Sequence, residues 1–317
     1  MISPVLGIFM IMDRSQNRRT FIKTTSGLLG AGMLAFNEPL KKQKLQLSFT
    51  TLGCPDWPYE KAVKFARENG YQGIEIRGIL RELNLPKCTD FNTPDKVKLS
   101  RKIAEDSGVK IVCLGASAPM HLPEGEKRIQ SLDEARQFID LAESLGCPYV
   151  RVFPNNLPKD QEKKATLDLI KKGLITLAEY AQKTSVSVLM ETHGDVVYAD
   201  DILDIMQGVN HAKVGLVWDM TNMWSVTKEV PIMVYPKLSP YIKHVHVKDF
   251  KMQDGKMRYT HVGQGLAPVF QGLDLLSKGG YKGFYSFEWE KLWHHELEEP
   301  EEMFPFYVRL MRGFEAR

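Results

Sequence analysis

The chain has 317 residues, of which 43% are hydrophobic and 26% are charged. That composition is ordinary for a globular protein, and the length suits one large domain or two small ones. Its 42 basic and 39 acidic residues give a formal net charge of +3, which argues against a nucleic-acid-binding protein with a strongly basic face.

The amino terminus has the pattern of an export signal. Residues 17–23 read NRRTFIK and are followed by the small, apolar run 26–36. Paired arginines, a following Phe and a modest apolar region are typical of the twin-arginine route. We therefore interpret residues 1–43 as a twin-arginine signal peptide and linker, and we expect a periplasmic protein.

The same region does not predict a membrane span. The apolar stretches 2–12 and 24–36 both fall short of the roughly 18 residues that a span needs. The sequence leaves open whether translation starts at Met1 or Met12, and whether the signal is cleaved near Ala35. An uncleaved signal would act as a membrane tether, and we expect no other membrane attachment.

From Lys44 onward, short apolar runs alternate with amphipathic segments. The apolar runs predict eight strands, near 46–52, 73–77, 109–115, 149–153, 186–191, 214–219, 243–248 and 284–289. The amphipathic segments predict helices between them and after the last, among them 59–69, 95–107, 131–145, 165–183, 200–207 and 301–314.

Eight repetitions of strand and helix predict an α/β fold, a single-domain (β/α)8 TIM barrel over residues 44–317. A doubly wound open sheet is the alternative. It is disfavoured because no GxGxxG follows the first strand, and Gly263-Gln264-Gly265 lies late in the chain without a third glycine in register. The polar segments 154–164 and 251–266 each follow a strand, so we expect them to lie over the barrel mouth.

Polar residues end four consecutive predicted strands in the second half of the chain. They are Glu191, Asp219, His246 and Glu288. Because the carboxyl ends of barrel strands converge on one mouth, these side chains are expected to surround one ion. Three carboxylates and one imidazole suit Mn²⁺, Co²⁺ or Mg²⁺ and also admit Zn²⁺. Both His244 and His246 face the same side of their strand, and His246 is nearer the carboxyl end.

Such an ion would hold a hydroxyl and a carbonyl of one sugar and stabilise an enediolate as a proton leaves the adjacent carbon. Glu191 and Glu288 are the expected acid and base, because the fifth and eighth strands approach the barrel axis from different directions. The other interpretation is that a Glu at a strand end forms a salt bridge and a His among valines packs in the core.

Other polar residues near strand ends are candidates for substrate binding. Glu75 and Arg77 share one face of the second strand, although an ion pair within the barrel explains them equally well. Lys248 lies two residues after His246 on the same side and offers a cation or a general acid. The remaining candidates are His121, Arg151 and His193.

Six segments resemble the xylose isomerase-like TIM barrel superfamily, in the branch often labelled sugar phosphate isomerase/epimerase. They are FTTLGCPDW at 49–57, GIEIR at 73–77, ETHGD at 191–195, Trp218-Asp219, HVHVKD at 244–249 and SFE at 286–288. The resemblance spans residues 46–316. It implies that Glu191, Asp219, His246 and Glu288 bind a divalent metal, and that the two glutamates act as acid and base.

The chain departs from one branch of that superfamily. Ketose 3-epimerases carry a histidine three residues after the metal aspartate and an arginine six residues after the metal histidine, whereas this chain has Asn222 and Met252 there. The run at 244–249 is closer to the branch of inosose dehydratase. Endonuclease IV shares the fold, but it needs a histidine-rich three-zinc cluster and a DNA-binding surface, which eight histidines and a balanced charge do not support.

The sequence therefore predicts a divalent-metal-dependent sugar isomerase or epimerase that works by proton abstraction beside a carbonyl. A keto-sugar lyase or dehydratase that uses the same metal site is the alternative within this chemistry. A non-catalytic periplasmic sugar-binding barrel is the alternative of another class. The expected partner is a small sugar or keto-sugar, and a homo-oligomer is compatible with the sequence. The sequence identifies neither the sugar nor the metal.

Overall fold

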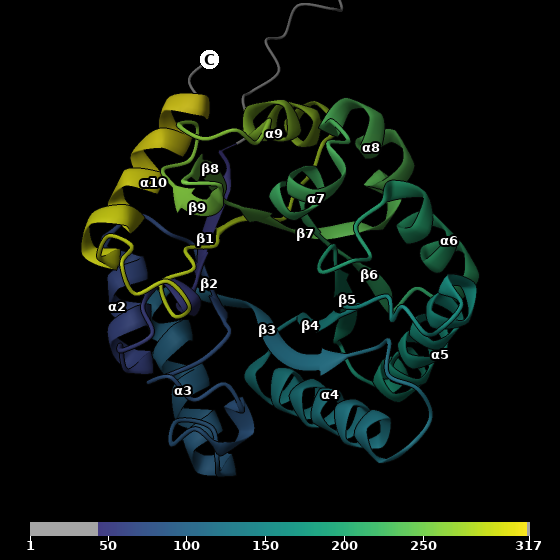
Figure 1. Ribbon diagram of the computed structural model, residues 1–317. Helices are drawn as coiled ribbons and strands as arrows, with labels where there is room; N and C mark the ends of the chain where they lie inside the picture. The colour runs from purple at the N-terminus through teal and green to yellow at the C-terminus, as the bar shows by residue number, and fades with distance from the viewer. Residues whose placement is uncertain (1–43, 316–317) are drawn as a thin grey trace, which may run out of the picture. The chain divides into compact units, whose positions relative to one another are not determined.

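Eight parallel strands close into a barrel in the computed structural model, which describes residues 44–315 (Figure 1). Around the barrel the strands follow the order β1-β10-β7-β6-β5-β4-β3-β2. Their bounds are β1 Gln46–Thr50, β2 Gly73–Ile76, β3 Lys110–Pro119, β4 Tyr149–Phe153, β5 Ser187–Glu191, β6 Val214–Asp219, β7 Ile242–Val247 and β10 Phe284–Phe287. The predicted (β/α)8 barrel is confirmed.

Helices surround the barrel (Figure 1). They are α2 Tyr59–Glu68, α3 Pro94–Ser107, α4 Glu126–Leu145, α5 Lys163–Tyr180, α6 Ala199–Val209, α7 Met220–Thr227, α8 Pro231–Leu238, α9 Val269–Lys278 and α10 Pro300–Glu315, with short 3-10 turns at Thr51–Gly53, Leu85–Lys87, Ala181–Lys183 and Ser239–Tyr241. In α2, Tyr59, Ala62, Val63 and Ala66 are buried, which is the spacing of a helix that packs one face on a core.

The prediction that residues 251–266 form a polar loop is partly wrong, because most of a β-hairpin lies within them. Strands β8 Asp249–Gln253 and β9 Lys256–Thr260 pair antiparallel. They are joined by Asp254 and Gly255, both with positive φ, as a tight hairpin turn requires. Residues 251–258 of the hairpin are all exposed. This part of the hairpin therefore has no buried face, and no alternation of apolar and polar residues was available to predict it.

Pairing between neighbouring strands brings polar residues together at one end of the barrel. Asp219 on β6 pairs with His246 on β7, and His246 pairs in turn with Ser286 on β10. On the other side of β6, Glu191 pairs with Val217. The polar strand ends of the second half of the chain therefore lie side by side.

None of the helices between residues 44 and 315 combines the length and the hydropathy that crossing a membrane requires. The predicted signal peptide, residues 1–43, lies outside the described residues.

Candidate metal centre and active site

Three carboxylates and one imidazole meet at the carboxyl end of the strands. Glu191, Asp219, His246 and Glu288 each offer one ligand atom, and these atoms all lie within 4.8 Å of one another. His246 Nδ1 is 3.3 Å from Glu288 Oε1, 3.7 Å from Glu191 Oε1 and 3.9 Å from Asp219 Oδ2. None of the four residues is more than 4% exposed. The structure thus brings together the residues that the sequence proposed as metal ligands.

The strands and one helix start fix these side chains. Glu191 and Asp219 are the last residues of β5 and β6, His246 is next to last in β7, and Glu288 directly follows β10. Asp219 also caps α7, because its Oδ1 accepts a hydrogen bond from the Asn222 backbone N–H at 2.8 Å. The cap uses one carboxylate oxygen and leaves Oδ2 for the cluster.

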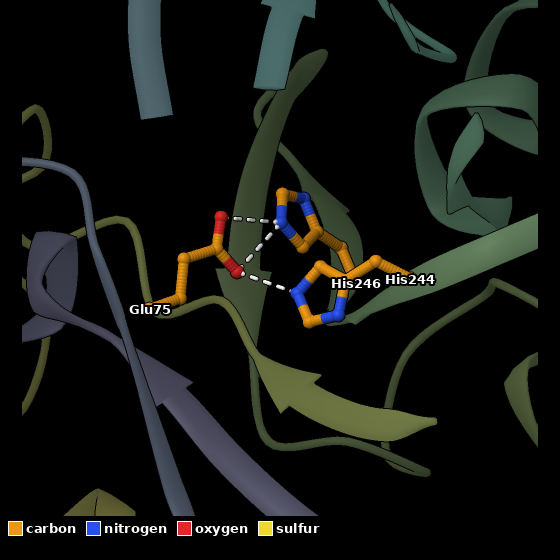
Figure 2. A group of neighbouring side chains, drawn as sticks. All are labelled: Glu75, His244 and His246. Carbon is orange, nitrogen blue, oxygen red and sulfur yellow. Dashed lines mark hydrogen bonds and ion pairs between the residues drawn. The ribbon is translucent and has the colours of Figure 1, made fainter. Parts of the chain in front are cut away.

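A fourth carboxylate, that of Glu75, lies on the other side of His246. Figure 2 shows Glu75 from β2 facing His244 and His246 from β7. Glu75 Oε2 is 2.9 Å from His244 Nε2, and Glu75 Oε1 is 3.0 Å from His246 Nε2. The Ser286 hydroxyl donates to Glu75 Oε2 at 3.0 Å. Glu75 is 1% exposed, so its carboxylate is committed to these partners.

The charge of Glu75 sets which nitrogen of His246 carries a proton. Burial alone would raise the pKa of Glu75, but His246 and His244 hold it well below its usual range. A charged carboxylate only accepts hydrogen bonds, so His246 Nε2 must donate. Nδ1 then faces the other carboxylates as the nitrogen that can bind a metal, an arrangement that is common around metal-ligating histidines.

The donor set fits a divalent cation. Within residues 44–315, His246 Nδ1 is a buried polar atom that lacks a hydrogen-bond partner, and the nearest partners of Glu191 Oε2 and Asp219 Oδ2 are the cations of Arg151 and Lys248, at 3.0 and 2.9 Å. Buried polar atoms are normally paired, and three carboxylates with one imidazole match the ligands of Mn²⁺, Co²⁺, Mg²⁺ or Zn²⁺. Burial lowers the pKa of His246, but Glu288, Glu75 and Glu191 outweigh it and raise this pKa well above its usual value. A bound cation would replace the extra proton.

Lys248 forms ion pairs with three carboxylates, two of which belong to the cluster. Its Nζ is 2.9 Å from Asp219 Oδ2, 2.6 Å from Glu288 Oε2 and 2.9 Å from Glu290 Oε1. Although burial opposes the charge, these carboxylates raise the pKa of Lys248 well above its usual value. Burial would likewise raise the pKa of Glu288, but His246 and Lys248 hold it well below the usual range. Glu288 is therefore a charged carboxylate next to a fixed ammonium group.

Arg151 has the corresponding position beside Glu191. Its Nε is 3.0 Å from Glu191 Oε2, and its Nη1 donates to the Ala116 carbonyl at 2.8 Å. Burial would raise the pKa of Glu191, but Arg151 and His246 lower it. In contrast, burial raises the pKa of Asp219 to about 6, even though Lys248 lies close. The two glutamates are thus held charged by separate cations.

A cavity of about 260 Å³ opens over the cluster. Both glutamates of the cluster line it, whereas Asp219 and His246 do not. Its lining consists of Leu52, Arg77, Arg151, Phe153, Glu191, His193, Glu288, Glu290 and Trp293. A molecule in this cavity would therefore contact the two residues that the sequence proposed as acid and base.

Three of the proposed substrate-binding residues line this cavity, namely Arg77, Arg151 and His193. Arg77 donates from Nη2 to the Ser117 hydroxyl at 2.8 Å, and burial, with the nearby charge of Arg151, lowers its pKa to about 10. His193 Nδ1 is 3.0 Å from Asn155 Oδ1, and burial lowers the pKa of the imidazole. His193 is therefore held as a largely neutral ring.

The other three proposed substrate-binding residues are not among those that line the cavity. Lys248 pairs with carboxylates of the cluster, and Glu75 bonds the two histidines. Their contacts favour a positioning role over the substrate contact that the sequence suggested. His121 is half-buried in the loop after β3, where burial lowers its pKa.

Four residues of the cavity were not proposed as site residues from the sequence, namely Leu52, Phe153, Glu290 and Trp293. Glu290 lies two residues after Glu288, so strand alternation could have placed both side chains on one face. Trp293 lies in a turn after β10, and no periodicity marks it. Only the fold shows that this turn reaches the cavity.

Comparisons with known proteins agree with this fold. A family model described as xylose isomerase-like TIM barrel matches residues 63–305. Fructoselysine 3-epimerase of Shigella flexneri is 23% identical over 258 residues, which cover 78% of this chain and 90% of the relative. A 3-dehydroshikimate dehydratase of Bacillus anthracis is 22% identical over 229 residues, which cover 67% of this chain and 76% of the relative.

A solved structure gives the same fold at low sequence identity. The 3-keto-D-glucoside 4-epimerase of E. coli superposes with a TM-score of 0.68 and 13% identity, over 85% of this chain and 100% of that chain. At this identity, the likeness concerns the fold alone.

Proposed function

The chain belongs to the xylose isomerase-like TIM barrel family, and we propose that it is a divalent-metal-dependent sugar isomerase or epimerase that removes a proton beside a carbonyl. The observation that carries the proposal is the pair Glu191 and Glu288. Both carboxylates belong to the candidate metal cluster, and both line the cavity above it. The epimerases among the chain's relatives support the same reaction class.

Glu191, Asp219, His246 and Glu288 would hold the cation. A divalent cation there would polarise a substrate carbonyl and stabilise the negative charge that develops on its oxygen. Glu75 keeps the His246 proton on Nε2, and the Asn222 backbone holds Asp219. These contacts fix two of the ligands before any substrate arrives.

The two glutamates would exchange the proton with the substrate carbon. One carboxylate removes the proton and the other returns a proton, and a return to the opposite face inverts the carbon. Arg151 steadies Glu191 at 3.0 Å, and Lys248 steadies Glu288 at 2.6 Å. Both glutamates are charged before substrate binds, because these cations and His246 lower their pKa values, so the one that returns a proton must first take one up from solvent.

Arg77 and His193 would orient the substrate from the cavity wall. His193 bonds Asn155 through Nδ1 at 3.0 Å, which leaves Nε2 for a substrate hydroxyl. Arg77 keeps one amino group without a hydrogen-bond partner among the described residues. Two fixed groups in the cavity lining would hold the sugar with the reacting carbon over the glutamates.

A keto-sugar lyase or dehydratase is the second candidate. A relative is a 3-dehydroshikimate dehydratase, and Glu290 lines the cavity with a pKa that burial raises, so it would supply a proton to a leaving hydroxyl. Epimerisation changes stereochemistry at constant mass, whereas elimination loses water or an aglycone. Mass spectrometry of the products separates the two. Sugar binding without any turnover would instead favour the non-catalytic barrel.

The proposed location is the periplasm, reached by the twin-arginine route. Its support is the sequence pattern at Arg18, Arg19 and Phe21.

The test is deuterium uptake from D₂O into a panel of keto-sugars that includes fructoselysine, 3-keto-D-glucosides and 3-dehydroshikimate. We expect exchange or conversion of at least one compound by the metal-loaded protein. Glu191→Gln and Glu288→Gln should each cut the rate by about 10²–10⁴-fold. Glu105→Gln, which alters an exposed carboxylate of α3, should keep the parent rate. Near-normal rates in both site variants would remove these residues from the acid and base roles.

A further inference from the structure

One indole stands apart from the other tryptophans of the chain. Trp57, Trp218 and Trp289 are at most 6% exposed, and Trp224 is half-buried, whereas Trp293 is 53% exposed. A single exposed aromatic is common in itself. Trp293, however, lines the cavity over the metal cluster.

The burial of the cavity walls places Trp293 at the rim. Glu191 and Glu288 are 2% and 4% exposed, and Leu52 is 4% exposed. Trp293 shares the cavity with these residues but keeps half of its surface in solvent. A substrate whose reacting carbon lies at the glutamates would therefore pass the indole where it leaves the cavity.

The turn that carries Trp293 is firmly held. The Leu292 N–H donates to the Leu52 carbonyl at 3.0 Å, and the Trp293 N–H donates to the Glu290 carbonyl at 3.1 Å. The buried Lys291 donates to the Leu297 carbonyl at 2.6 Å and pairs with Glu299 at 2.9 Å.

The indole of Trp289 extends this support by donating to the Glu298 carbonyl at 2.9 Å. The Trp289 bond ties the two ends of the segment 289–298 to each other, and the Leu292 bond ties the segment to the 3-10 turn after β1. The exposure of Trp293 is therefore a property of an ordered turn, and a preformed turn presents its side chain to a ligand without an ordering cost.

We propose that Trp293 is an aromatic platform for a group attached to the reacting sugar, so that the substrate is a glycoside or similarly substituted keto-sugar rather than a free monosaccharide. This rests on the proposed function. The cavity of about 260 Å³ is below the 300–1,000 Å³ typical of sites that enclose larger ligands. A substituent must therefore emerge at the rim, where the indole face offers stacking to the C–H face of a second sugar or to an aromatic aglycone.

The test compares 3-keto-D-glucose with its methyl, phenyl and glucosyl glycosides, using the metal-loaded parent, Trp293→Ala and Trp293→Phe. We expect the parent to favour the phenyl and glucosyl compounds. Trp293→Ala should lose about tenfold in kcat/KM on these two, mainly through KM, and nothing on the free sugar. Trp293→Phe should recover most of the loss. The phenyl and glucosyl arms show which substituent the indole prefers. Equal effects of Trp293→Ala on free and substituted sugars would overturn the proposal.

Binding supplies a readout that does not depend on turnover. Phenyl and glucosyl 3-keto-glucosides should quench the exposed tryptophan emission of the parent, and Trp293→Phe should abolish this change. If the parent turns over no compound but still shows this selective quenching, the proposed function fails while the platform stands. If the parent turns over these compounds without preferring the substituted ones, and no quenching occurs, the proposed function stands and the platform fails. A changed sedimentation coefficient of Trp293→Ala with unchanged ligand preference would assign the indole to a contact between copies of the chain and overturn the proposal.

Discussion

At the scale of single residues, His246 depends on a partner far away in the sequence. Glu75 lies on β2 and His246 on β7, yet they are 3.0 Å apart across the barrel interior. The contact selects Nδ1 as the free nitrogen, and a hydrogen-bonded carboxylate increases the basicity of a ligating imidazole. Glu75 therefore serves the cluster without belonging to it.

Glu75→Gln should weaken metal binding by about 10–100-fold, because a neutral amide holds the imidazole less firmly. Competition with a metal-sensitive dye measures the affinity. Ser286→Ala is the matched control, since it removes one hydrogen bond to the same carboxylate and should have a much smaller effect. Unchanged affinity in Glu75→Gln would show that Glu75 does not position His246.

The sequence predicted which residues meet where these lie at strand ends. Glu191, Asp219, His246 and Glu288 follow short apolar runs, and strand convergence brings such residues together. The partnership of Glu75 with His246 was not predictable, because it depends on which side chains meet inside a closed barrel. Trp293 lies in a turn whose position depends on tertiary contacts.

At the scale of elements, two loops at the barrel mouth hold each other. Asp195 in the loop after β5 accepts a hydrogen bond from the Leu157 N–H at 3.0 Å, and His193 contacts Asn155. Gly194 has a φ of +67°, and a Cβ there would lie 3.0 Å from the Asn155 carbonyl oxygen. The close approach of the two loops requires a glycine.

Gly194→Ala should therefore destabilise the protein and raise KM by displacing His193. Gly108→Ala is the matched control, because Gly108 has nearly the same φ, +66°, but no other atom lies within 4 Å of the position that its Cβ would occupy. The control should cost about 1–2 kcal/mol of left-handed strain. Gly194→Ala should cost about 1–3 kcal/mol more, from the steric clash. Denaturant unfolding and steady-state kinetics measure the two effects, and equal losses would contradict the loop contact.

The elements themselves were predictable to different degrees. All eight barrel strands were placed from their apolar runs, and α4 was expected to begin at 131 but begins at Glu126. A helix was expected after each strand, but the ranges of α7, α8 and α9 were not predicted. The first two have only eight residues each, too few for a helical period to emerge, and α7 begins directly at the end of β6, where Asp219 serves both as cap and as strand end.

At the scale of the whole molecule, the charges around the cavity favour a cation. Five buried or nearly buried carboxylates, those of Glu75, Glu191, Asp219, Glu288 and Glu290, face the three cationic side chains of Arg77, Arg151 and Lys248. Uncompensated buried charge is costly. With His246 neutral as a ligand, a divalent ion would balance the remaining two negative charges.

Export can be tested on the whole chain. Replacing both Arg18 and Arg19 by Lys should leave the protein in the cytoplasm, because the twin-arginine route recognises the arginine pair. Cell fractionation and immunoblotting measure the distribution. Arg14→Lys changes a nearby arginine outside the pair and should leave export intact. Periplasmic recovery of the double variant would refute the predicted route.

The measurement that tests the metal centre most directly is metal content, by elemental mass spectrometry, of the protein purified from its native host. We predict about one equivalent of Mn, Co, Mg or Zn in the parent. Asp219→Ala/His246→Ala, with its fold checked by circular dichroism, should retain little. A correctly folded parent without bound metal, or equal metal in the parent and the double variant, would contradict the assignment of Glu191, Asp219, His246 and Glu288 as a metal site.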